Sequence, residues 1–314
     1  MSQCSRDVRS PWSCLLLAAG LCACEDPLID PALIAGPRIV GARVGGELDS
    51  ALAEPAAGQA ATLDWLVLSD QPGAFTAHVA WCIGAPTVLG APRCAWEAFA
   101  EQSATGRFGE PLRFGFSVPA ELEPGEAWLA WIGICDSGEA RFDPAASVFR
   151  CAEGEPLSGF YRGFVPEGAP NRNPSLADDS LVLDGAAWLA PDATPPEAGS
   201  ACLGLGLPEL RAEQPSSVLF ELGGDDREEL ENVPGTYAAH PRESLVYTHL
   251  ATHPGLDRAF SAIDYDATEL AFEVPLDADP PAGPEGTTLR FFLLVRDERG
   301  GVDWLMRQAC LLPP

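Results

Sequence analysis

Apolar and polar residues alternate along much of this chain, which is the pattern of half-buried β-strands. The alternation is clearest in residues 75–83, where every second position is apolar: Phe75, Ala77, Val79, Trp81 and Ile83. Because successive side chains of a strand point to opposite faces of a sheet, these residues should share one buried face. The segment therefore predicts a strand with one side in a core.

Strand-like segments recur in both halves of the chain, separated by turns rich in Pro and Gly. They are residues 62–69, 112–118, 127–135, 217–222, 244–251, 268–275, 287–296 and 302–311. The last two flank residues 297–301, Asp-Glu-Arg-Gly-Gly, which predict a hairpin turn. Short strands with closely spaced turns are typical of antiparallel sandwiches rather than βαβ units. One short helix is expected within residues 96–108.

A polar segment with three prolines, residues 165–178, interrupts the strand pattern. Such a composition is typical of a linker between domains. We therefore expect an all-β chain with two immunoglobulin-like antiparallel β-sandwich domains, residues 37–164 and 179–314. Each is long enough to bury a sandwich core.

The first residues read as a secretory leader. Arg6 and Arg9 precede an apolar run, residues 12–23, which is shorter than the about 20 residues that span a bilayer. Leu21, Ala23 and Cys24 match the processing box of bacterial lipoproteins. We expect a signal peptide at 1–23, a lipidated Cys24 and a tether at 24–36. The alternative is an ordinary secretory signal cut near Ala23, with Cys24 a plain thiol.

The charge balance excludes several classes of function. The formal net charge is −27 at pH 7, and all 19 basic residues are Arg. Nucleic acids and anionic membrane surfaces attract basic patches, so neither is an expected partner. Mechanisms that need a lysine, such as Schiff-base chemistry, are also excluded.

Six cysteines follow Cys24 in the sequence: Cys82, Cys94, Cys135, Cys151, Cys202 and Cys310. An even number in an exported protein predicts three disulfides. The sequence allows many pairings, and our working prediction joins them in order: Cys82 with Cys94, Cys135 with Cys151 and Cys202 with Cys310. A metal site is disfavoured because no CxxC or Cys-plus-His cluster is present.

No complete catalytic motif stands out. The nucleophile elbow G-x-S-x-G is missing, and Ser158 in Pro-Leu-Ser-Gly lacks the first glycine. His78 is expected on the surface of its strand. His249 and His253 would share a zinc ion on a helix, with His240 a third ligand only by coincidence. On a strand they would lie about 13 Å apart, so we expect them at the surface and in a turn.

Two weaker candidates for binding remain. Asp264, Asp266 and Glu269 form the best cluster of carboxylates for calcium, although they lack the central glycine of an EF-hand loop. The alternative is a solvated acidic turn, and no other cofactor is expected. Among the tryptophans, the strand positions predict buried side chains for Trp65, Trp81, Trp131 and Trp304. A sugar-binding platform would need several exposed tryptophans on one face, and Trp96 and Trp128 are expected to be the most exposed.

Several motifs together resemble the uncharacterised lipoproteins of myxobacteria and related deltaproteobacteria. They are the box with Cys24, the segment 37–44, Trp81-Cys82, Asn171-Arg172-Asn173-Pro174 leading into 181–185, and residues 296–304. The resemblance implies an envelope location and immunoglobulin-like β domains, and it implies no activity.

From these features we expect an exported, non-catalytic protein with a binding or structural role. Its lipid would anchor it to the cell envelope, most simply the outer membrane, with the side of the membrane left open. Its partners would be the membrane, through the lipid, and a protein or glycan of the envelope. The alternatives are a glycan-binding module and a hydrolase with a non-standard site.

Overall fold

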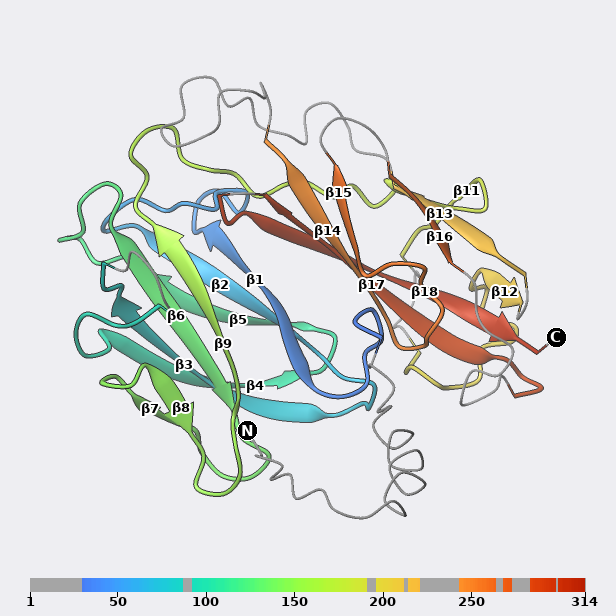
Figure 1. Ribbon diagram of the computed structural model, residues 1–314, viewed down its shortest axis with the longest axis horizontal. Coiled ribbons are helices and arrows are strands. Elements are labelled where there is room, and N and C mark those ends of the chain that lie inside the picture. Colours follow the sequence, from blue (N-terminus) through green and yellow to red (C-terminus); the bar gives the residue numbers. More distant parts are fainter. Residues whose placement is uncertain are drawn as a thin grey trace, which may run out of the picture. The chain divides into compact units, whose positions relative to one another are not determined.

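The computed structural model describes residues 30–86, 92–190, 196–211, 214–220, 243–263, 268–272, 283–297 and 299–313. Within these ranges the regular structure consists of 18 β-strands, so the chain is all-β as predicted (Figure 1). Residues 31–314 form one compact unit. The expected signal peptide and Cys24 lie outside the described residues.

The N-terminal half contains two sheets that face each other. Strands β1 (Arg38–Gly46), β2 (Ala60–Leu68) and β5 (Pro111–Ser117) form an antiparallel sheet in the order β1-β2-β5. The second sheet has the order β4-β3-β6-β9, with β3 (Ala74–Ile83), β4 (Ala100–Arg107), β6 (Ala127–Ile134) and β9 (Leu157–Phe164). A small hairpin, β7 (Arg141–Asp143) and β8 (Val148–Arg150), packs on β6.

The C-terminal half also contains two sheets. The larger has the order β12-β18-β17-β14-β15, formed by β12 (Glu209–Arg211), β14 (Leu245–Ala251), β15 (Phe260–Ile263), β17 (Thr287–Asp297) and β18 (Val302–Leu312). The smaller has the order β11-β10-β13-β16, formed by β10 (Leu181–Leu183), β11 (Ala186–Ala187), β13 (Ser216–Phe220) and β16 (Thr268–Phe272). Strand β12 pairs in parallel with β18, whereas the other strand pairs among the described residues are antiparallel. The expected hairpin at 297–301 is confirmed, since β17 and β18 pair along their length.

The alternation in β3 places its apolar face in the first core, as predicted. Phe75, Ala77, Val79 and Trp81 are buried between the two N-terminal sheets, and Ile83 packs against them. The indole of Trp81 stacks on Phe116, with ring centroids 5.8 Å apart. Aromatic contacts of this kind add to the free energy that burial of the apolar surface supplies.

Two strands are buried on both faces and join the halves. In β17, Leu289, Phe291, Leu293 and Val295 enter the core of the C-terminal half. Phe292 and Leu294, on the opposite face, form a third core with Leu66 and Leu68 of β2. The β1-β2-β5 sheet therefore contributes one face to the first core and the other to this third core. The four sheets make four successive layers with three cores between them.

The prediction of a short helix within residues 96–108 is wrong, because strand β4 occupies most of this segment. Every residue of β4 pairs with β3, from Ala100 opposite Trp81 to Arg107 opposite Ala74. Strand β4 is an edge strand with mostly exposed side chains. Its sequence therefore shows little apolar alternation, and backbone pairing with β3 decides its conformation.

Three disulfides form, with the pairing that the sequence analysis proposed. They are Cys82–Cys94, Cys135–Cys151 and Cys202–Cys310. The second closes the base of the β7-β8 hairpin, and the third ties the segment before β12 to β18. The third spans 108 residues of sequence, and a loop of that length gives about 4–5 kcal/mol in the chain-entropy model.

Parts of the expected tether (24–36) and of the expected linker (165–178) are packed against the strands of the fold, whereas a free tether and linker would be surrounded by solvent. Residues 32–34 bond to the end of β14, with the Ile34 N–H donating to the Ala251 carbonyl at 2.8 Å. In the segment 165–178, Asn171 and Asn173 are buried. The division of the chain into two domains stays a prediction.

The third core predicts that the two halves unfold together. Leu294 is fully buried in it, so Leu294→Ala should lower the free energy of unfolding by about 2–5 kcal/mol. Urea denaturation followed by tryptophan fluorescence should show one transition that moves as a whole. The control is Leu48→Ala, because Leu48 is 100% exposed and its loss should change stability by less than about 0.5 kcal/mol. Two separate transitions, with only one displaced by Leu294→Ala, would contradict this joint unfolding.

Candidate functional site

A buried polar junction lies beside the third core, where the turn between β17 and β18 meets two segments of the N-terminal half. The Asn171 side chain donates to Asp297 Oδ2 at 2.9 Å, and the backbone N–H of Gly301 donates to Oδ1 at 2.7 Å. Arg299 pairs with Glu54 at 3.0 Å. Burial raises the pKa of Asp297, and the hydrogen bonds from Asn171 and the turn oppose that rise.

Gly301 is required at this junction because no space is left for a side chain, and its backbone conformation is not the reason. A Cβ atom there would overlap Asp297 Oδ2, and it would also lie 2.9 Å from the Arg172 carbonyl oxygen. Any side chain would therefore push the turn away from residue 172. The Gly-Gly sequence of the hairpin turn thus serves the contact between the halves.

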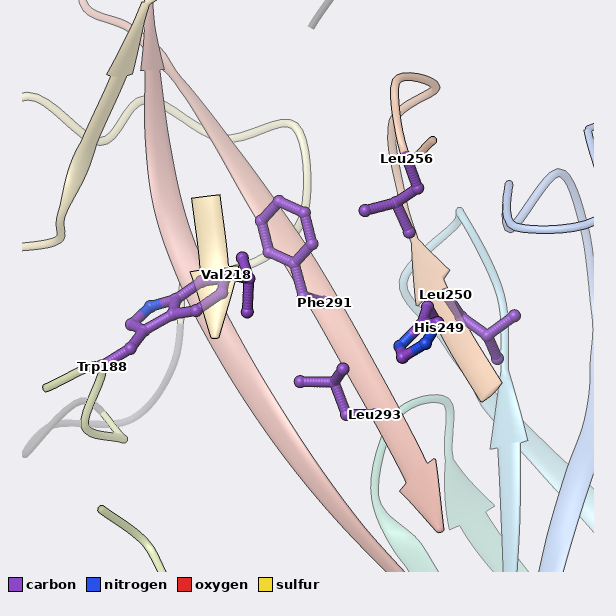
Figure 2. A pocket seen from close by; sticks show the side chains of 7 residues that line it. All are labelled: Trp188, Val218, His249, Leu250, Leu256, Phe291 and Leu293. Carbon is purple, nitrogen blue, oxygen red and sulfur yellow. The ribbon is translucent and has the colours of Figure 1, made fainter. Parts of the chain in front are cut away.

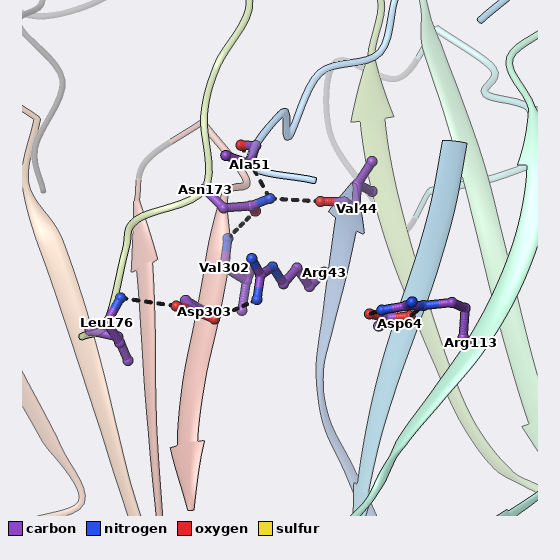
Figure 3. A network of polar contacts seen from close by, with 9 residues as sticks. All are labelled: Arg43, Val44, Ala51, Asp64, Arg113, Asn173, Leu176, Val302 and Asp303. Atoms are coloured by element: carbon purple, nitrogen blue, oxygen red, sulfur yellow. Dashed lines mark hydrogen bonds and ion pairs between the residues drawn. The ribbon is translucent and has the colours of Figure 1, made fainter. Parts of the chain in front are cut away.

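Asn173 links β1 to β18 directly (Figure 3). Its side-chain nitrogen donates to the Val44 carbonyl at 2.7 Å, and its side-chain oxygen accepts from the Val302 N–H at 2.9 Å. Next to it, Arg43 donates to Asp303 at 2.7 Å, and the Leu176 N–H donates to the other carboxylate oxygen at 3.0 Å. Burial raises the pKa of Asp303, and Arg43 opposes that rise.

Two further contacts complete the junction. The Tyr161 hydroxyl donates to the Gly300 carbonyl at 3.1 Å, and burial raises the pKa of Tyr161. The guanidinium of Arg296 donates to Thr248 at 2.8 Å and to the Val40 carbonyl, and burial lowers its pKa. Most carboxylate, amide and guanidinium groups of the junction thus bond to one another, whereas Oδ1 of Asn171 is buried without a hydrogen-bond partner among the described residues. These hydrogen bonds stabilise the join between the halves.

The second candidate site is a small apolar pocket in the C-terminal half (Figure 2). It lies between β13 of one sheet and β14 and β17 of the other, and its cavity volume of about 10 Å³ leaves room for about one water molecule. The lining residues are Trp188, Val218, His249, Leu250, Leu256, Phe291 and Leu293. His249 is the one lining residue with a titratable side chain.

His249 is 2% exposed, so its predicted surface position is wrong. Strand β14 lies between β15 and β17, and His249 shares its inward face with Tyr247 and Ala251. Nε2 of His249 lies 3.1 Å from the Ser261 hydroxyl, and Nδ1 has no hydrogen-bond partner in the described part of the chain. Burial, with a smaller effect of Arg258, lowers the pKa of His249 to about 4. The imidazole is therefore neutral at pH 7.

The surface position expected for His253 is also wrong. His253 is buried, and its Nδ1 lies 2.9 Å from the carbonyl oxygen of Pro254. The described ranges contain no group of three or more His, Cys, Asp or Glu residues that could hold a metal ion. His240 lies outside these ranges, as do Asp264, Asp266 and the side chain of Glu269. The calcium site therefore stays a prediction.

The burial of the tryptophan side chains agrees only in part with the prediction. Trp65, Trp81 and Trp131 are buried, and Trp304 packs partly buried against the third core. Trp96 is 73% exposed as expected, but Trp128 is fully buried, so its predicted exposure is wrong.

The reason for the burial of Trp128 is that β6 is covered on both faces. Trp128 enters the first core, and Trp131 on the other face packs with Phe149 of the β7-β8 hairpin. Gly163 on the neighbouring strand β9 leaves room for the indole, because a Cβ atom there would overlap the Trp128 ring.

The residues considered for hydrolysis do not converge on a triad. Ser158 is exposed on β9. His78 is half-buried on β3. Its Nδ1 lies 2.7 Å from the hydroxyl of Ser103, the residue that pairs with it on β4. Nε2 of His78 is buried without a hydrogen-bond partner among the residues that the structure describes, so no carboxylate there orients the ring. The hydrolase alternative stays a prediction.

A helix that could cross a membrane is not found in the described portion of the chain. No protein-family model matches the sequence, and a search of the curated proteins finds no match.

Solved structures with a distant similarity to the chain include two much longer proteins. Red sea bream transglutaminase matches with a TM-score of 0.24 and 8% identity, over 87% of this chain and 31% of that chain. Dimeric latent PorU from Porphyromonas gingivalis matches with a TM-score of 0.20 and 9% identity, over 90% of this chain and 24% of that chain. The chain thus spans less than a third of the length of either protein, and the similarity assigns no activity.

The lowered pKa of His249 predicts a loss of stability in mild acid. The pKa falls from 6.5 to about 4 on folding, so between these values the unfolded chain binds more protons than the folded one. Stability should therefore fall as the pH drops through this window, by about 2 kcal/mol from pH 7 to pH 5.

Comparison with His249→Gln separates the contribution of His249 from that of the carboxylates, because the titration of the carboxylates affects the stability of both proteins equally. Urea denaturation at pH 7 and pH 5 should show the wild type losing about 2 kcal/mol more than the variant. An equal loss in both proteins would contradict the assignment to His249.

Proposed function

We propose that this is a lipid-anchored protein of the cell envelope with a non-catalytic binding or structural role. The observation that carries the proposal is the cysteine count. The three disulfides pair all six cysteines after Cys24, and disulfides indicate an extracytoplasmic protein. These three pairs do not use Cys24, which ends the Leu-Cys-Ala-Cys box and is the proposed lipid site.

The anchor would act through the first residues of the mature chain. A diacylated cysteine supplies two acyl chains, which is enough for stable anchoring, whereas a single chain binds only marginally. Because residues 32–34 pair with β14, the folded body would begin soon after the anchor. The net charge of −27 would keep that body away from anionic lipid headgroups.

A structural or binding role fits the architecture of the body. Four β layers with three cores and a bonded junction make a rigid support rather than a hinged enzyme. We propose that the two halves are immunoglobulin-like sandwiches, supported by their paired antiparallel sheets. The outer membrane is the proposed location, because a diacylated envelope protein fits it most simply.

Substitution of Cys24 tests the anchor. Full-length wild-type protein should sediment with membranes and carry palmitate label, whereas Cys24→Ser should appear in the soluble fraction without label. Cys22→Ser is the matched control, because it lies two residues away in the same box and should stay membrane-bound. Membrane association of a correctly folded Cys24→Ser protein would overturn the proposed anchor.

A glycan-binding role is the second candidate, and exposed aromatic rings favour it. On the outer face of the β4-β3-β6-β9 sheet, Phe160 is 48% exposed and its ring lies 5.3 Å from that of Trp131. Trp96 is 73% exposed, two residues before Ala98, which packs against the same cluster as Trp131. Exposed aromatic faces of this kind suit the apolar faces of sugar rings.

Double substitution of Trp96 and Phe160 by Ala should abolish binding to a glycan array and leave the melting temperature unchanged. Leu48→Ala provides an exposed control outside the cluster. A wild-type protein that binds no glycan, or binding that survives the double substitution, would count against this role.

A further inference from the structure

Two exposed leucines lie on the loop that precedes β12. Leu203 is 57% exposed and Leu205 is 55% exposed, although a leucine side chain gains free energy when it leaves water. The next leucine differs, because Leu207 packs against the Cys202–Cys310 disulfide. The loop therefore uses one leucine for its own packing and presents the other two to its surroundings.

The conformation of this loop is fixed by its backbone and by the strands beside it. The Leu203 N–H donates to the Glu285 carbonyl at 2.9 Å, and the disulfide ties the loop to β18. Gly204 and Gly206, on either side of Leu205, have φ angles of +84° and +74°, a conformation that suits glycine. The exposure of the two leucines is thus part of a defined turn.

The chain enters the folded body at the same end of the large C-terminal sheet. The Thr288 N–H donates to the Ser200 carbonyl at 2.8 Å, so the segment that leads into the loop lies beside the start of β17. Ala251 bonds to residues 32–34 and pairs with Phe291 of β17. Thr288 and Phe291 are three positions apart on that strand, which is about 10 Å.

The length of the tether keeps this end of the body close to a lipid on Cys24. Ala32 follows Cys24 by eight residues, and an extended chain covers at most about 3.6 Å per residue, or about 29 Å in all. A membrane that holds the lipid therefore lies within reach of the loop.

The charge around the loop selects the kind of lipid surface. Glu285 is exposed beside the loop, and Glu197 and Glu209 are exposed before and after it in the sequence. Anionic headgroups repel carboxylates, whereas zwitterionic headgroups carry no net charge. A zwitterionic surface thus allows the leucines to be buried without opposition from these groups.

We propose that residues 203–206 dock on the zwitterionic lipid surface that holds the anchor, with Leu203 and Leu205 entering the boundary between headgroups and acyl chains. Apolar groups of interfacial proteins enter this boundary by about 5–10 Å. The docking rests on the lipid anchor proposed above and adds an orientation to it. The end of the large sheet with the loop faces the membrane, and the turn between β17 and β18 points away.

Quenching by brominated phosphatidylcholine tests the docking. The lipidated full chain is reconstituted into vesicles whose acyl chains carry bromine, which quenches indoles that it contacts. Leu205→Trp should lose more emission than the wild type does. Leu48→Trp is the matched control and should show no additional loss. Leu48 is 100% exposed, and its neighbour Asp49 pairs with Arg172, whose carbonyl lies next to Gly301 beyond the far end of β17.

Sedimentation of the same vesicles separates the anchor from the docking. Protein that stays in solution overturns the anchor, and the docking with it. Protein that sediments but shows equal quenching in Leu205→Trp and Leu48→Trp overturns the docking alone. A blue-shifted but unquenched emission from Leu205→Trp assigns the loop to a contact with another copy of the chain, which also overturns it.

The lipid composition gives a further readout. Replacement of part of the phosphatidylcholine by anionic phosphatidylglycerol should reduce the quenching of Leu205→Trp, because the exposed carboxylates around the loop are repelled. Stronger quenching on the anionic vesicles would contradict the zwitterionic surface.

Discussion

The packing of the β1-β2-β5 sheet against the hairpin of β17 and β18 is the contact on which the rest of the structure depends. It buries Leu66 and Leu68 of β2 against Phe292 and Leu294 of β17, and it makes both strands internal. A strand that is apolar on both faces has no stable position at a surface. Each half therefore needs the other to cover an apolar face, and the four sheets form one layered unit.

Polar groups beside this packing give it a defined register. Apolar contacts alone tolerate sliding, whereas Asn173, Asp303 and Asp297 each have partners in one relative position only. Several arginines serve this purpose, since Arg43 and Arg299 form ion pairs there.

The sequence predicted those elements whose own residues specify them. The apolar face of β3, the hairpin at 297–301 and the three disulfides follow from alternation, turn residues and an even cysteine count. The errors concern residues whose surroundings come from elsewhere in the chain. Strand β4 forms through pairing with β3, and Trp128 is covered because Gly163 on another strand leaves space for it. The two asparagines of the expected linker gave no sign that they would be buried.

The same division applies to the candidate sites. By itself the sequence determined the all-β class, the positions of most strands and the six paired cysteines, because these follow from local periodicity and composition. It also carries the box around Cys24, which needs no fold to be recognised. Only the tertiary structure decided that His249 faces a pocket, that Asp297 and Asn173 join the two halves, and that β2 and β17 are covered twice. Burial is a property of both contacting surfaces, and a sequence pattern describes only one of them.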